Sequence, residues 1–159
     1  MTPTRRRLLR AGSAALLLAA GHARAAETFE VAHADEEWRA LLGPDRYLVL
    51  RQSATEPPFS SPLLKEHRAG TFACAGCARP LFASSTKFDS DTGWPSFWRA
   101  RPKAVAESRD RSLGMERTAV HCRGCGGHLG HVFGDGPRPT NLRYCINGLA
   151  LAFTPKHPL

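Results

Sequence analysis

Two C-x-x-C pairs, Cys74/Cys77 and Cys122/Cys125, constrain this chain more than any other feature. Each pair has a glycine before its second cysteine, which favours a tight turn in which both thiolates point at one centre. Two such turns complete a tetrahedral S₄ site for zinc, or for iron in the same geometry. Because 44 residues separate the pairs, a bound metal would tie together distant parts of the chain.

Two other uses of these four cysteines stay open. A thioredoxin-like redox pair needs a βαβ context, and the sequence around the pairs lacks one. Disulfides are compatible with an oxidising compartment, but two disulfides within C-x-x-C turns would be unusual structural links. The sequence therefore favours one structural zinc ion held by all four cysteines.

The first 25 residues have the layout of a secretory signal peptide. A basic region with four arginines precedes an apolar run, and an A-x-A site follows, with cleavage expected after Ala25. The apolar run is too short to cross a bilayer, so we expect no stable membrane insertion after the signal is removed. Adjacent arginines favour the twin-arginine export route over the general secretory route. We therefore expect a signal peptide over residues 1–25, one domain over residues 26–159 and a periplasmic location.

The basic composition belongs largely to that first segment. The full chain has a formal charge of +8, but residues 1–25 hold five arginines and no acidic residue, so the remainder carries about +3. A nucleic-acid partner thereby loses its main support, and we expect none. The 12 prolines and 14 glycines favour a β-rich chain with many turns over a helical bundle.

Short apolar segments between turn residues predict strands over 71–74, 80–84, 104–108, 115–122, 128–133, 142–147 and 149–153. Residues 35–52 favour two short helices, with Asp35 capping the first, Gly43 ending it and Pro44 opening the second. Three prolines exclude long regular structure over residues 53–70, which we expect to wrap the core as an extended arm. The predicted fold class is mainly β: two small antiparallel sheets packed together, with short N-terminal helices and a pair of loops clipped by zinc.

The fifth cysteine, Cys145, belongs to neither pair. A lone cysteine is commonly a small buried hydrophobe. On a strand, however, Arg143 and Asn147 share its face by the period of two, and such a polar face is not a core pattern. A guanidinium beside a thiol favours the thiolate. Upstream, His128 and His131 are candidate proton donors, although either can equally be structural.

An aromatic cluster follows a glycine in the stretch GWPSFW. Trp94, Phe97 and Trp98 can be core aromatics, or they can form one wall of an apolar pocket. Pro95 fixes the turn between them in either case.

The stretches over residues 74–98 and 120–147, in that order, resemble the B-type peptide-methionine (R)-S-oxide reductases, the methionine sulfoxide reductase B family. The similarity extends over about residues 55–153 and implies two antiparallel sheets and one structural zinc ion. By motif, it implies the zinc ligands Cys74, Cys77, Cys122 and Cys125, the nucleophile Cys145, a substrate-methyl contact at Trp94, and a site shaped by His128, His131, Arg143 and Asn147.

The resemblance implies reduction of methionine-R-sulfoxide, protein-bound or free. The Cys145 thiolate would attack the sulfoxide sulfur, His131 would protonate the oxygen, and methionine would leave a sulfenic acid on the cysteine. Many family members place a resolving cysteine just before the tryptophan turn, whereas this chain has Thr92 there, and Asp91 where glycine is usual. The expected partners are therefore oxidised proteins and an external thioredoxin-like or other thiol reductant, and we expect the enzyme to be a monomer.

Two other classes of protein remain as alternatives. A zinc-ribbon binding module would account for the four paired cysteines but not for Cys145. A periplasmic thiol–disulfide oxidoreductase would use one C-x-x-C pair for catalysis and would keep its fold when that pair is mutated.

Overall fold

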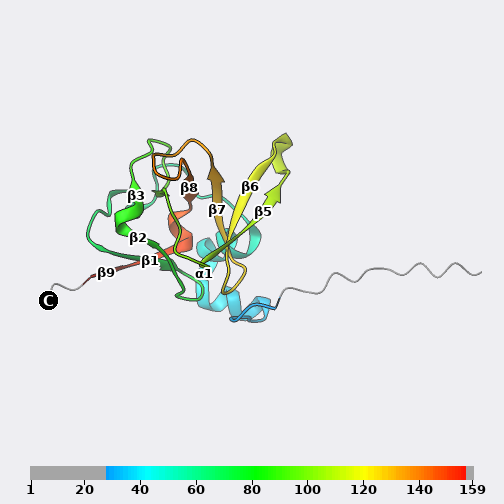
Figure 1. Ribbon diagram of the computed structural model, residues 1–159. Coiled ribbons are helices and arrows are strands. Elements are labelled where there is room, and N and C mark those ends of the chain that lie inside the picture. The colour runs from blue at the N-terminus through cyan, green and yellow to red at the C-terminus, as the bar shows by residue number, and fades with distance from the viewer. Residues whose placement is uncertain (1–27, 157–159) are drawn as a thin grey trace, which may run out of the picture.

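The computed structural model describes residues 28–156, so the expected signal peptide lies outside the described residues. Within this range a single α-helix precedes two antiparallel sheets (Figure 1). The helix is α1 (Asp35–Gln52). The three-stranded sheet has the order β2-β1-β9 and contains β1 (Gly70–Cys74), β2 (Pro80–Ala83) and β9 (Leu151–Pro155). The six-stranded sheet has the order β3-β4-β8-β7-β6-β5 and contains β3 (Lys87–Phe88), β4 (Ser96–Phe97), β5 (Val105–Asp110), β6 (Arg117–Cys122), β7 (His128–Phe133) and β8 (Arg143–Ile146).

This architecture confirms the mainly β prediction with two antiparallel sheets. Each predicted strand is present, with ends shifted by a few residues. Four short 3-10 helices are present in the described part of the chain: η1 (Pro62–Lys65) lies between α1 and β1, and η2 (Ser84–Thr86), η3 (Ser112–Gly114) and η4 (Gly148–Ala150) lie between strands. The β5–β6 hairpin, which carries η3 at its tip, projects from the body of the molecule (Figure 1).

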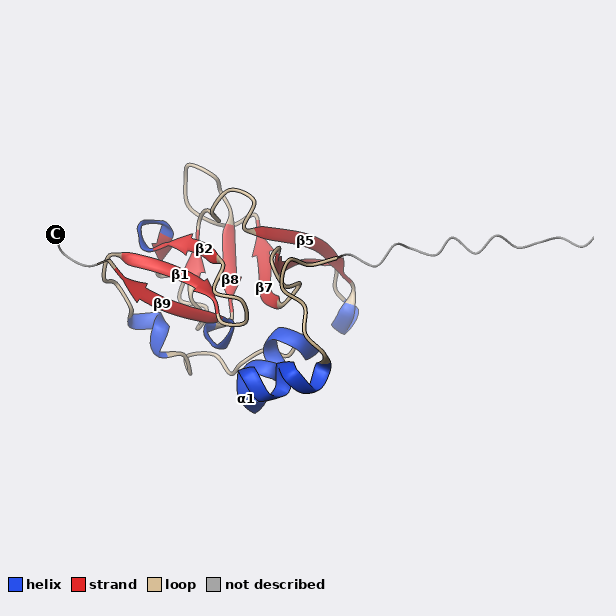
Figure 2. Ribbon diagram, turned by 90° about the horizontal axis from the view of Figure 1, so that it is seen from below, coloured by secondary structure: helices blue, strands red, loops and turns tan. Residues whose placement is uncertain are grey.

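The prediction for α1 holds at Gly43 but not at the N-cap of the helix. Gly43 has φ 69° and ψ 173°, outside the helical region, so the predicted break between two helices is present as a kink inside α1. The N-cap is Ala34, and the predicted cap at Asp35 is wrong. Asp35 is the first helical residue, and its carboxylate accepts hydrogen bonds from Arg39 and from the Tyr47 hydroxyl. The helix packs against β7 and η4 (Figure 2).

Stacked aromatic rings from both sheets occupy the core. The rings of Phe82 and Phe97 stack with their centroids 4.3 Å apart, and Phe72 meets Phe97 edge-on at 5.0 Å. Phe97 is therefore a core aromatic, whereas Trp98 is only half-buried. Among the described residues, no helix combines the length and the hydropathy that crossing a membrane requires.

Candidate active site and metal centre

The four paired cysteines meet in one cluster. Cys74 and Cys77 flank the turn from β1 to β2, and Cys122 and Cys125 flank the turn from β6 to β7, so each sheet contributes one turn. The Sγ atoms of Cys74 and Cys125 are 3.7 Å apart, those of Cys77 and Cys122 are 3.5 Å apart, and all four lie within 4.8 Å of one another. None of the described cysteines forms a disulfide.

The geometry of this cluster fits a bound metal ion. Zinc–sulfur bonds of about 2.3 Å in a tetrahedron place the sulfurs about 3.8 Å apart, close to the spacing of the cluster. Three of the cysteines are buried in the core, and four thiolates so close together are stable only if a cation balances their charge. The cluster can therefore hold one zinc ion that links the two sheets.

Cys145 lies near the middle of the six-stranded sheet. On β8 it pairs with Ser96 of the neighbouring β4 and with His131 of β7. It opens into a cavity of about 120 Å³, whose lining residues are Thr55, Trp94, Arg117, Gly130, His131, Phe133, Cys145 and Asn147. A larger cavity of about 670 Å³ beside β9 contains no thiol or imidazole, so the chemistry favours the smaller one. The structure thus brings four of the predicted site residues together in one cavity, and His128 and Arg143 do not line it.

A β-bulge in β7 determines which way the two histidines face. His121 of β6 pairs with His128, and Ala119 pairs with His131, because the register shifts by one residue around Leu129. Residues three apart therefore point to the same face, where strict alternation would place them on opposite faces. The imidazole centroids of His128 and His131 are 5.5 Å apart. The amide of Asn147 donates a hydrogen bond of 3.1 Å to the carbonyl of the bulged Leu129.

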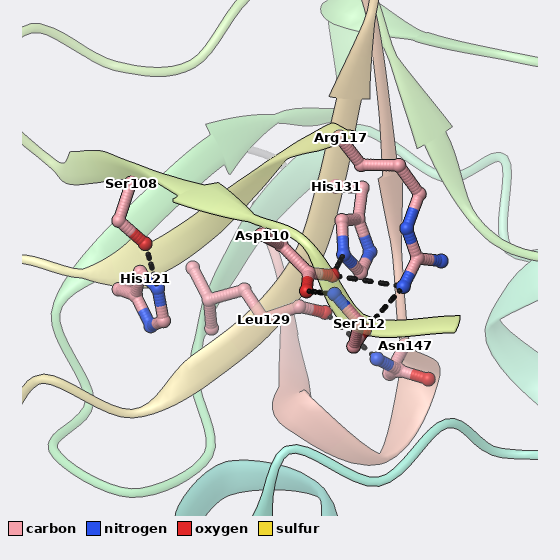
Figure 3. A network of polar contacts seen from close by, with 8 residues as sticks. All are labelled: Ser108, Asp110, Ser112, Arg117, His121, Leu129, His131 and Asn147. Atoms are coloured by element: carbon pink, nitrogen blue, oxygen red, sulfur yellow. Dashed lines mark hydrogen bonds and ion pairs between the residues drawn. The ribbon is translucent and has the colours of Figure 1, made fainter. Parts of the chain in front are cut away.

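His131 is held by a carboxylate that comes from the neighbouring hairpin (Figure 3). Its Nε2 lies 2.8 Å from Oδ2 of Asp110 at the end of β5, and the same oxygen accepts a hydrogen bond of 2.8 Å from Arg117. The backbone N–H of Ser112 donates to Asp110 at 2.8 Å and, with His131, holds the pKa of Asp110 well below its usual range. An ionised Asp110 therefore orients the imidazole of His131.

His128 occupies a different environment. Its side chain is buried, and neither ring nitrogen has a hydrogen-bond partner among the described residues. Burial lowers the pKa of His128 from 6.5 to about 4. A buried, neutral imidazole outside the cavity is poorly placed to deliver a proton to a substrate there.

Arg143 shares the strand with Cys145 but is already paired. Its guanidinium donates two hydrogen bonds to the carboxylate of Asp135, at 2.9 and 2.8 Å, and stacks on Phe133 at 4.5 Å. Burial raises the pKa of the Cys145 thiol, while a hydrogen bond with Thr92 and the charge of Arg143 oppose this. The sequence-based expectation that Arg143 favours the thiolate has the right direction, but burial has the larger effect.

The arm between α1 and β1 closes one side of the cavity. The indole N–H of Trp94 donates to the carbonyl of Glu56 at 3.1 Å, and the N–H of Glu56 donates to Oδ1 of Asn147 at 3.0 Å. The buried Glu56 carboxylate accepts hydrogen bonds from the N–H groups of Gly148 and Leu149. Two of the predicted site residues, Trp94 and Asn147, are therefore fixed through one residue of the arm.

Several residues of this site were missed from the sequence. Asp110 and Arg117 lie in a charged stretch that resembles any solvated hairpin, and Glu56 lies in a proline-rich segment. A partial signal was present, because Asp110 lies just after the strand predicted over 104–108 and Arg117 lies near the start of the strand predicted over 115–122.

Comparison with known proteins finds relatives that cover most of the chain. The model of the SelR domain family matches residues 42–155. A peptide methionine sulfoxide reductase MsrB of Leifsonia xyli is 54% identical over 130 residues, which cover 80% of this chain and 94% of the relative. The peptide methionine sulfoxide reductase MsrB of Bradyrhizobium diazoefficiens is 56% identical over 128 residues, covering 80% of this chain and 92% of the relative. The chain therefore belongs to the MsrB family, whose members share the SelR domain.

Proposed function

We propose that this protein reduces the R epimer of methionine sulfoxide to methionine, in oxidised proteins and as the free amino acid. One observation carries the proposal: Cys145 opens into the same small cavity as His131 and Trp94, with Asp110 behind the imidazole. The relatives named above are peptide methionine sulfoxide reductases, and their identity with this chain supports the same activity here.

The proposed reaction moves one oxygen atom from the substrate to the enzyme. His131 first accepts the proton of the half-buried Cys145 thiol, and the thiolate attacks the sulfoxide sulfur while the indole of Trp94 packs against the substrate methyl group. The sulfoxide oxygen takes the proton back from His131, so no free oxyanion forms. The oxygen ends on sulfur as Cys145–SOH, and methionine leaves with the two electrons that the cysteine sulfur has lost.

Regeneration requires a thiol from outside the chain. The four other cysteines form the cluster that can hold zinc, and Thr92, whose hydroxyl lies 3.8 Å from the sulfur of Cys145, has no thiol. Two equivalents of an external thiol, from a thioredoxin-like protein or a small molecule, would convert the sulfenic acid to thiol with loss of water and formation of the reductant's disulfide. This step needs access to Cys145, which is partly exposed.

In this proposal the zinc ion at Cys74, Cys77, Cys122 and Cys125 is structural. The ion would supply a rigid link between the turns of the two sheets, and the reaction does not pass through it. We further propose that residues 1–25 direct the enzyme to the periplasm, supported by their basic and apolar pattern.

Turnover of the two separated sulfoxide epimers, with dithiothreitol as reductant, tests the activity. We expect reduction of the R epimer and none by Cys145→Ser, which should keep its fold and metal content. Equal rates on both epimers, or a preference for the S epimer, would refute the assignment.

The proton carrier is tested by comparing His131→Gln with His128→Gln in single-turnover experiments. General acid–base catalysis contributes about 10²–10⁴-fold, so His131→Gln should slow the first turnover by at least about 100-fold. His128→Gln should have a much smaller effect, because its imidazole lies outside the cavity. Similar losses in both variants would contradict a specific role for His131.

A further inference from the structure

A chain of three hydroxyl groups leads to the sulfur of Cys145 from the side opposite to His131. Ser96 Oγ lies 2.7 Å from Ser90 Oγ, Ser90 Oγ lies 2.8 Å from Thr92 Oγ1, and Thr92 Oγ1 lies 3.8 Å from the sulfur of Cys145. Ser96 is buried and pairs with Cys145 across β4 and β8, so the chain starts on the strand beside the thiol.

The backbone of the turn over residues 90–94 places these hydroxyls. Asp91 has φ 56° and Gly93 has φ 93°, so two residues in the left-handed region reverse the chain on either side of Thr92. Aspartate tolerates this conformation better than most residues, which explains how it occupies a position where glycine is usual in the family. The left-handed turn brings the Thr92 hydroxyl back to Cys145, although the two residues are 53 positions apart in sequence.

Each hydroxyl in the chain has one hydrogen and can reverse its direction. With a neutral thiol, Cys145 can donate to Thr92, Thr92 to Ser90 and Ser90 to Ser96, whose hydroxyl donates to the carbonyl of Trp94 at 3.2 Å. With a thiolate, all three hydroxyls can turn round, so that Ser96 donates to Ser90, Ser90 to Thr92 and Thr92 to the sulfur. The same atoms can therefore satisfy both protonation states of the nucleophile.

We propose that Thr92 donates a hydrogen bond to the Cys145 thiolate and that Ser90 and Ser96 relay and strengthen it. Thr92 is thus a part of the nucleophile's environment in its own right, in addition to occupying the place of a resolving cysteine. A hydrogen bond to the charged form favours that form, and neighbouring hydrogen bonds in a chain polarise one another. The half-buried Cys145 thiol needs this support, because the guanidinium of Arg143 is shared with Asp135.

The inference rests on the proposed role of Cys145 as the reactive thiol, but its test does not require sulfoxide reduction. The rate of Cys145 alkylation by iodoacetamide is measured against pH in the metal-bound protein, with the labelled peptide identified by mass spectrometry. Thr92→Val keeps the shape of the side chain and removes the hydroxyl, Thr92→Ser keeps the hydroxyl, and Ser90→Ala breaks the relay. Ser108→Ala is the control, because its hydroxyl bonds with His121 and is not part of the chain of hydroxyls that leads to Cys145.

At pH 7 we expect Thr92→Val to alkylate about tenfold more slowly than the parent, as the loss of one hydrogen bond to a charged group predicts. The rates should converge at high pH, where the thiol is ionised in both proteins. Thr92→Ser should restore the parent profile, Ser90→Ala should show a smaller loss, and Ser108→Ala should show none. An unchanged profile in Thr92→Val, or a Thr92→Ser variant that behaves like it, would overturn the inference. A parent that alkylates as expected but does not reduce sulfoxide would instead count against the proposed function alone.

Discussion

Thr92→Cys should convert the enzyme from a one-thiol to a two-thiol mechanism. Thr92 Oγ1 and the Cys145 sulfur are 3.8 Å apart, whereas a disulfide needs about 2.05 Å between its sulfurs. The remaining approach of the two sulfurs must come from rotation about χ1 of the new cysteine and from movement of the turn that carries it. The sulfenic acid formed on Cys145 should then condense with the thiol introduced at position 92, releasing water.

The stability of the oxidised variant gives a second measure of the same event. The new bond would close a loop with a sequence separation of 53, for which the chain-entropy model gives about 4 kcal/mol of stabilisation. Strain in the turn and residual links through the metal cluster reduce this figure, so it is an upper value. Oxidised Thr92→Cys should therefore unfold at a higher urea concentration than its reduced form.

The assay uses one equivalent of sulfoxide without a reductant. Parent and variant should each yield one equivalent of methionine, but the parent should lose one free thiol and the variant two. A sulfenic-acid trap should label Cys145 in the parent and fail to label the variant. The control Ser60→Cys, whose side chain lines the separate cavity beside β9, should lose one thiol as the parent does.

Two results would refute the reasoning. If Thr92→Cys lost one thiol and stayed reactive to the trap, the turn would not bring residue 92 to bonding distance. If the parent itself lost two thiols, a cysteine of the metal cluster would be acting as the resolving residue.

Three further outcomes are expected. Cys77→Ser should lose both metal and cooperative folding, measured by metal analysis and circular dichroism, whereas Cys145→Ser should lose neither; a folded, metal-free Cys77→Ser would contradict a structural site. Burial lowers the pKa of His128 from 6.5 to about 4, so the unfolded chain binds a proton that the folded chain does not, and stability should fall by about 2 kcal/mol between pH 7 and pH 5. Urea unfolding should show a weaker pH dependence in His128→Asn, and equal slopes would count against this cause. Glu56→Gln should destabilise the fold by about 1.5–3 kcal/mol in urea unfolding, because the amide keeps only one acceptor for two buried N–H groups; an unchanged midpoint would show that the arm is held by other contacts.

Local patterns in the sequence were sufficient for most of the fold. The strands β5 to β8 show apolar or alternating segments between glycines, and the metal cluster follows from the spacing of its cysteines. The strands β3 and β4 were missed because each has only two residues, too few to show a period. The cap of α1 was misassigned to Asp35, whose carboxylate is engaged by two side chains further along the helix.

The site was only partly predictable because some of its contacts depend on register. Cys145, His131 and Trp94 could be named from motifs that are continuous in sequence. The support of His131 by Asp110 depends on how β5, β6 and β7 align, and no local pattern encodes that alignment. The hydrogen bond from the N–H of Gly148 to the carboxylate of Glu56 joins residues that are 92 positions apart, so it could be recognised only in the folded structure.

Because of the bulge at Leu129, the number of residues between His128 and His131 determines whether the two imidazoles lie on the same face of the sheet. Between His128 and His131 the number of intervening residues is even, and only the extra residue of the bulge lets both imidazoles face the same side. Inserting one residue between the two histidines would turn one imidazole to the opposite face, and deleting Leu129 would remove both the bulge and the carbonyl that holds Asn147. Replacing Leu129 by another apolar residue would leave the number of intervening residues unchanged. Insertions and deletions in β7 should therefore be far less tolerated than substitutions, even where the new side chains are apolar and fit the core.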